Sequence, residues 1–132
     1  MVIDSSALLA ILLDEPERRA FNEAIEQAAA RRLSVANLLE TSIVIETRYG
    51  AEGLRDLDHF LAIAGIERVA VDLPQVELAR RAFSQYGKGR HPAGLNFGDC
   101  FAYALAKDLA EPILFKGRDF SQTDLEAVLA IQ

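Results

Sequence analysis

Short apolar runs alternate with longer amphipathic segments along this chain of 132 residues. The short runs predict buried strands at 1–3, 33–35, 66–71 and 113–115. The amphipathic segments predict helices over 7–13, 16–30, 38–49, 51–64, 74–86 and 97–110, and a last short segment over 125–131. Short apolar strands separated by helices are typical of a parallel sheet with helices on both faces, so we expect an α/β fold.

Polar residues and a glycine mark the expected helix boundaries. Asp4, Asn37 and Asp72 each stand just before a predicted helix, where a side-chain oxygen can accept a backbone N–H as an N-cap. Gly50 is expected to end the helix over 38–49 and to separate it from the next one.

Length and composition limit the class of protein. We expect one domain over residues 1–132, large enough to bury about two-thirds of its unfolded surface. With 51% hydrophobic and 26% charged residues, the composition is that of a globular chain. The single Cys100 excludes an intramolecular disulfide and a multi-cysteine zinc site. The apolar run at 7–13 follows no basic residue and is too short for a bilayer, so we expect a cytoplasmic protein without a membrane partner.

The charge distribution is uneven. The formal net charge is −6, which by itself disfavours nucleic acid. The segment 80–91 nevertheless carries several basic residues and no acid, and its Gly-rich end holds Lys88, Arg90 and His91. These three side chains could hold a phosphate even in an acidic protein. A solvated helix face and loop explains the same charges equally well.

Acidic residues follow the predicted strands. Asp4 comes directly after the first strand, Glu40 lies one turn into the helix after the second, and Asp99 lies in the first turn of its helix. The last predicted strand ends at Phe115, and Asp119 lies four residues beyond it. Since the carboxyl ends of parallel strands share one edge of the sheet, these four acids are expected to converge there. Taken singly, each could be a helix cap or a solvated surface acid.

Convergence of these carboxylates has an electrostatic consequence. Four ionised carboxylates about 5 Å apart repel by roughly 3 kcal/mol per pair at an effective dielectric near 20. Their sum of roughly 20 kcal/mol exceeds the net stability of a domain, so either their pKa values rise or a cation neutralises them. Ligands that are all oxygen select Mg²⁺ or Mn²⁺, which activate water and bind phosphate oxygens. The sequence therefore predicts a site for a divalent cation that can activate water and bind a phosphate oxygen.

The acidic segments also resemble a known family. Residues 2–8 (VIDSSAL), 38–41 (LLET), 94–100 (GLNFGDC) and 117–120 (GRDF) resemble the successive motifs of PIN-domain nucleases. Residues 87–103 are similar to VapC toxins, which often carry a comparable Gly-Arg-His-Pro loop. The resemblance implies a three-layer α/β/α sandwich around a short-stranded parallel sheet. It also implies a Mg²⁺- or Mn²⁺-dependent endoribonuclease toxin of a type II toxin–antitoxin system, with a VapB antitoxin as partner and a homodimer as assembly.

Site roles follow from the same resemblance. It implies that Asp4, Glu40 and Asp99 are catalytic metal ligands and that Asp119 is the fourth acid. Many relatives carry Thr and Asp or Asn at the positions corresponding to 115 and 117, where this chain has Phe and Gly. Asp124 is therefore a possible supporting acid beside Asp119.

Ser6 has two interpretations. Its hydroxyl either supports a metal-bound water or a ligand carboxylate, or it simply caps the first helix. Both stay open on the sequence.

Other function classes fit less well. A phosphatase with an aspartyl nucleophile needs a second acid two residues after the first, and Ser6 stands there. A receiver-like domain needs paired acids before the aspartate of the first strand, and residues 1–3 supply none. The remaining alternative is a non-catalytic metal-binding domain that binds RNA or a partner, which a nuclease assay with and without chelator would distinguish.

Overall fold

The structure, a computed structural model that describes residues 1–129, contains a four-stranded parallel sheet in the order β3-β2-β1-β4. Its strands are β1 (Val2–Ile3), β2 (Arg32–Ser34), β3 (Glu67–Val69) and β4 (Ile113–Leu114). The four predicted strands are confirmed. The third is shorter than predicted because β3 lies at the edge and pairs only with β2, whose last residue, Ser34, is the partner of Val69.

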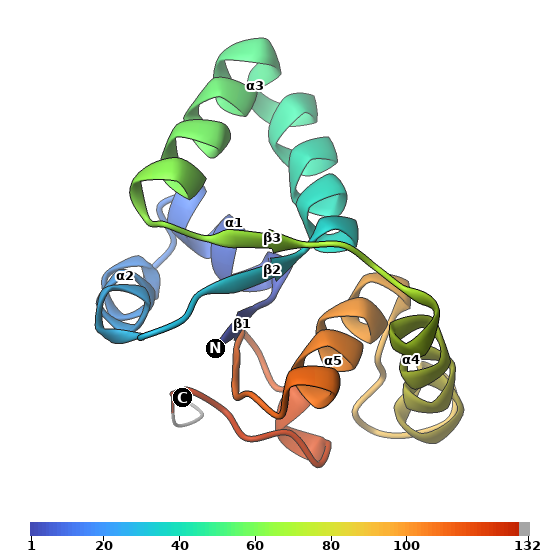
Figure 1. Cartoon of the computed structure of the whole chain (residues 1–132). Coiled ribbons are helices and arrows are strands. Elements are labelled where there is room, and N and C mark those ends of the chain that lie inside the picture. Colours follow the sequence, from blue (N-terminus) through green and yellow to red (C-terminus); the bar gives the residue numbers. More distant parts are fainter. Residues whose placement is uncertain (130–132) are drawn as a thin grey trace.

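The helices are α1 (Ser5–Leu12), α2 (Arg18–Gln27), α3 (Val35–Ile63), α4 (Leu73–Tyr86) and α5 (Phe97–Leu109), followed by the 3-10 helix η1 (Phe120–Gln122). The predicted break at Gly50 is confirmed, because this residue has a φ of 67° and divides α3 into two arms (Figure 1). The predicted helix over 16–30 ends earlier, since Ala28 is already extended and leads into β2.

Two of the three predicted caps are confirmed and one is wrong. Asp4 caps α1 and Asp72 caps α4 through their side-chain oxygens. Asn37 is not a cap, because α3 begins at Val35 and the Ser34 hydroxyl accepts the N–H of Ala36 at 3.3 Å. Asn37 therefore lies inside α3, where it is fully buried.

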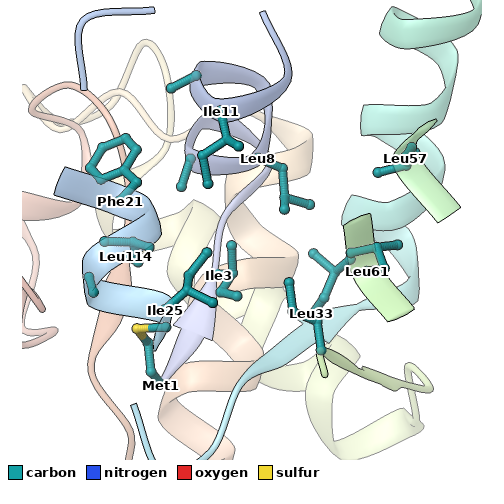
Figure 2. Close-up of a cluster of buried hydrophobic side chains, with 14 residues drawn as sticks. Met1, Ile3, Leu8, Ile11, Phe21, Ile25, Leu33, Leu57, Leu61 and Leu114 are labelled. Atoms are coloured by element: carbon teal, nitrogen blue, oxygen red, sulfur yellow. The ribbon is translucent and has the colours of Figure 1, made fainter. Parts of the chain in front are cut away.

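Helices cover both faces of the sheet, which confirms the predicted three-layer α/β/α architecture (Figure 1). On one face, α1, α2 and α3 pack over Ile3, Leu33 and Leu114, as Figure 2 shows. On the other face, α4 and α5 pack over Val2 and Ile113. Neighbouring residues of β1 and of β4 thus face opposite layers, as side chains along a strand must.

The end of the described chain runs beside β4. The N–H of Ile113 donates to the Glu126 carbonyl and the N–H of Val128 donates to the Ile113 carbonyl, both at 2.9 Å. The predicted last segment, 125–131, lies here up to residue 129, and residues 130 and 131 lie outside the described residues. None of the helices within residues 1–129 is long and apolar enough to span a bilayer.

Candidate active site

Asp4 lies where β1 ends and α1 begins, with only 2% of its surface exposed. Its Oδ2 accepts the backbone N–H of Ser6 at 3.0 Å. Its Oδ1 is buried and has no hydrogen-bond partner among the described residues. Burial raises the pKa of Asp4 to about 6, against the opposing effect of the hydrogen bonds from Ser6, and the charge of Glu40 adds to the rise.

Asp99 lies in the first turn of α5, as predicted, and forms a reciprocal capping box with Asn96. The N–H of Asn96 donates to Asp99 Oδ2 at 3.0 Å, and the N–H of Asp99 donates to Asn96 Oδ1 at 2.9 Å. Burial raises the pKa of Asp99 to about 7, and the negative charges of Asp4, Asp119 and Glu40 raise it further. Asp99 therefore lies within electrostatic range of the other three predicted acids, and Asp4 lies within range of Glu40.

Glu40 reaches this group from α3, where it is half-buried. Its carboxylate lies directly over the backbone of Gly98 in α5. A Cβ added to Gly98 would lie 2.6 Å from Glu40 Cδ and Oε1, and closer still to Oε2. The two helices thus bring Glu40 and Asp99 to one place, although the residues are far apart in sequence.

Asp119 is the exposed member of the group, and it lies just before η1. The preceding loop is attached to the first acidic motif, because Ser6 Oγ accepts the backbone N–H of Lys116 at 2.9 Å. Ser6 therefore joins the start of α1 to the loop that carries Asp119. Its further role at a metal or a water stays a prediction.

Asp124 has other partners. Its Oδ1 accepts the Tyr103 hydroxyl at 2.6 Å, and its Oδ2 accepts Lys107 Nζ at 2.8 Å. Both partners belong to α5, so the two hydrogen bonds attach the segment after η1 to this helix. Each carboxylate oxygen of Asp124 is thus already engaged away from the four acids.

The acids match a hard cation in donor chemistry but not in their present spacing. No three His, Cys, Asp or Glu side chains within residues 1–129 are grouped so that they could hold a metal ion as they stand. The donors are nevertheless all carboxylates, as Mg²⁺ and Mn²⁺ prefer, and Asp4 Oδ1 is a buried oxygen that lacks a partner.

The basic segment forms a folded loop that runs into the N-terminus of α5. His91 Nδ1 accepts the N–H of Ala93 at 3.0 Å, and its ring meets Tyr86 edge-on at 5.1 Å. The Arg90 guanidinium lies 5.5 Å from the centre of the Phe83 ring. Lys88 is exposed. The loop thus presents Lys88, Arg90 and His91 on the chain that leads to Asp99.

Two residues at this site were not predicted from the sequence. Asn37 was expected to cap a helix, and Gly98 carried no signal of its own beyond its place in the acidic motif. Asn37 contacts Glu40 and the Gly98 carbonyl, and Gly98 lies against Glu40 and directly precedes Asp99. Only the packing of α3 on α5 shows this, because neither residue type suggests the contact in the sequence.

Comparison with known proteins gives the family. Residues 1–126 match the PIN domain model. Over 128 residues the chain is 54% identical to a protein of Mycolicibacterium smegmatis named Ribonuclease VapC, covering 97% of this chain and 99% of that protein. The chain belongs to the VapC ribonucleases of the PIN-domain family. The resemblance predicted from the acidic motifs is thereby confirmed.

Solved structures show the same fold at low sequence identity. Mycobacterium tuberculosis VapC20, described as a toxin that cleaves the sarcin–ricin loop, is similar with a TM-score of 0.76 and 14% identity, over 94% of this chain and 95% of that one. A chain of a toxin–antitoxin complex from Klebsiella pneumoniae has a TM-score of 0.67 and 15% identity, over 93% and 92% of the two chains. This VapC-type chain therefore has the PIN-like α/β/α fold.

Proposed function

We propose that this VapC-family ribonuclease is an endoribonuclease that hydrolyses RNA phosphodiesters with Mg²⁺ or Mn²⁺ at Asp4, Glu40, Asp99 and Asp119. The observation that carries the proposal is the pair of buried carboxyls, Asp4 and Asp99, whose pKa values are raised to about 6 and about 7. Neighbouring buried carboxyls with raised pKa values are candidates for a functional site.

Each acid has a proposed role. Asp4 and Asp99 hold the cation, because both are buried and Asp4 Oδ1 lacks another partner among the described residues. Glu40 helps to hold it or orients the attacking water, and Asp119 completes the site from its exposed loop. A divalent cation supplies Lewis-acid stabilisation of the charged phosphoryl oxygens when it is bound.

The basic loop positions the RNA. Lys88, Arg90 and His91 are proposed to contact phosphates, which fix the register of the substrate but carry no base information. His91 Nδ1 already accepts the Ala93 N–H, so in the neutral ring Nε2 carries the proton and is the donor left for a phosphate. Net charge alone would repel RNA, so binding depends on this loop and on neutralisation of the acids.

A protein partner is also proposed, namely a VapB-type antitoxin in a type II toxin–antitoxin pair, together with a homodimer. Support comes from family membership, from the similar chain in a toxin–antitoxin complex, and from exposed apolar side chains near the acids. Leu39, Ile43 and Phe97 are 62%, 57% and 79% exposed, as at protein interfaces. The proposed RNA substrate places the activity in the cytoplasm.

The test is cleavage of a labelled RNA by the purified chain in Mg²⁺, in EDTA and with Mg²⁺ restored. The proposal expects cleavage that stops in EDTA, returns with the cation and is lost in folded Asp99→Asn. Cleavage that is equally fast in EDTA or in Asp99→Asn would overturn it. RNA binding without cleavage under any condition would favour the non-catalytic alternative.

A further inference from the structure

A buried asparagine connects the elements that carry the acids. Asn37 lies inside α3 and is fully buried. Its Nδ2 donates to the Gly98 carbonyl of α5 at 3.0 Å and lies 3.4 Å from Glu40 Oε1. Its backbone carbonyl accepts the Ser5 hydroxyl at 3.2 Å, next to Asp4. One residue thus contacts all three segments on which Asp4, Glu40 and Asp99 lie.

Packing alone does not explain an amide at this position. Asn37 Oδ1 is buried and has no hydrogen-bond partner among residues 1–129. A buried polar atom without a partner is unfavourable, and asparagine is a poor residue for a helix interior. An apolar side chain of similar size would fill the space without this cost. The two contacts of Nδ2 are therefore what distinguishes asparagine here.

Gly98 supplies the other half of the arrangement. Its φ lies outside the left-handed region, so the backbone of α5 does not require glycine there. The Glu40 carboxylate occupies the space of a side chain at this position, because an added Cβ would lie 2.6 Å from Glu40 Cδ and real Cβ contacts stay above 3.0 Å. An alanine would force Cδ back by at least 0.4 Å, the difference of these two values, and Oε2 by more.

We propose that Asn37 and Gly98 are positioning residues that hold the Glu40 carboxylate against the first turn of α5, near Asp99. Asn37, on α3, donates its amide N–H toward the carboxylate. Gly98, on α5, has no side chain and so leaves room for the carboxylate beside the helix. Neither residue is charged, so both act through the position of Glu40. The proposal rests on the proposed ribonuclease function, since it assigns Glu40 a fixed place in that reaction.

Gly98→Ala tests the glycine. Alanine favours a helix over glycine, so the variant should unfold at the same urea concentration as the parent or a higher one. Its RNA cleavage should nevertheless fall by about 10- to 100-fold in kcat, with KM within threefold, because a small misplacement of a catalytic group acts on the chemical step. A crystal structure of the variant should show Glu40 Cδ displaced from residue 98. Unchanged kcat, or an undisplaced Glu40 carboxylate, would overturn the proposal.

A double-mutant cycle tests whether the clash is the cause. Glu40→Asp withdraws the carboxylate from residue 98 and should itself lower kcat. Adding Gly98→Ala to Glu40→Asp should then cost less than threefold more, because the shorter side chain leaves room for the Cβ. If the decreases in kcat caused by Gly98→Ala and Glu40→Asp are fully additive, Gly98 does not act through the position of Glu40 and the proposal is overturned.

Asn37→Leu removes the amide while keeping the branched shape and the number of side-chain heavy atoms, and Asn22→Leu, at a half-buried asparagine of α2, is its control. The account expects Asn37→Leu to lose about tenfold in kcat and Asn22→Leu to keep the parent value. If Asn37→Leu folds and cleaves like the parent, Asn37 is not a positioning residue. A parent chain that cleaves no RNA would instead contradict the proposed function, which separates the two failures.

Discussion

Replacing Asp4 by asparagine should stabilise the metal-free protein at alkaline pH. The asparagine carbonyl can still accept the Ser6 N–H that Asp4 Oδ2 now accepts at 3.0 Å, so the cap is kept while the buried charge is removed. Since burial raises the pKa of Asp4 from 3.8 to about 6, the ionised carboxylate costs the folded state about 3 kcal/mol at pH 8. Asp4→Asn should recover that amount less the cost of burying its amide NH2, which would lie where Oδ1 has no partner among the described residues.

The sign of the pH dependence follows from the raised pKa. The cost is complete above the folded pKa near 6, falls as the pH drops through 6, and vanishes below the unfolded value of 3.8. The cost of the carboxylate is about 3 kcal/mol at pH 8 and about 1 kcal/mol at pH 4.5. Urea unfolding in EDTA should therefore show that the stability of Asp4→Asn relative to the parent is about 2 kcal/mol greater at pH 8 than at pH 4.5. A divalent cation should narrow the gap at pH 8 by stabilising only the parent.

The matched control is Asp72→Asn at the N-cap of α4. Asp72 Oδ1 also accepts a backbone N–H, that of Gln75 at 3.0 Å, but Asp72 is exposed. Exchanging one good cap for another should change the free energy of unfolding by less than about 0.5 kcal/mol at either pH. If the stability of Asp4→Asn relative to the parent changes between pH 4.5 and pH 8 as little as that of this control, ionisation of the buried Asp4 carboxyl carries no cost and the reasoning is refuted.

Other variants test the remaining parts of the site. Asp99→Asn should lower RNA cleavage in Mg²⁺ by at least about 100-fold while circular dichroism stays native, and near-parent cleavage would contradict its role as a ligand. Asp124→Asn should leave RNA cleavage within threefold of the parent and lower the free energy of unfolding by about 1 kcal/mol, because the Asp124 oxygens accept hydrogen bonds from Tyr103 and Lys107. Loss of cleavage in a folded variant would instead make Asp124 one of the catalytic acids. Lys88→Ala with Arg90→Ala should raise KM for RNA about tenfold at unchanged kcat and flatten its salt dependence, and an unaltered KM would exclude the loop as the phosphate contact.

Much of the fold could be predicted because its signals are local. The apolar runs marked the four strands, and Gly50 marked the break in α3 through its need for a positive φ. Helix ends were harder to predict. Ser34 and Asn37 are both good capping residues, and the choice between them depends on where β2 stops.

That Asp4, Glu40 and Asp119 lie at one edge of the sheet could be predicted, because each follows a strand of a parallel sheet and the ends of such strands share an edge. The contacts that these acids make with neighbouring residues could not be predicted. The contact of the Glu40 carboxylate with Gly98 depends on how closely α3 approaches α5. The hydrogen bond between Asp124 and the Tyr103 hydroxyl depends on the path of the chain after η1, which brings Asp124 back to α5. Such contacts arise from tertiary packing, which no spacing in the sequence encodes.

Calorimetric titration of the purified chain with Mn²⁺ at pH 8 tests the central claim most directly. Carboxylates that cost free energy when they are ionised together should take up the cation at a saturable site, and Asp99→Asn should weaken that uptake at least tenfold. If the parent takes up no Mn²⁺, or if Asp99→Asn takes it up as tightly as the parent, the four acids do not form a metal-dependent centre.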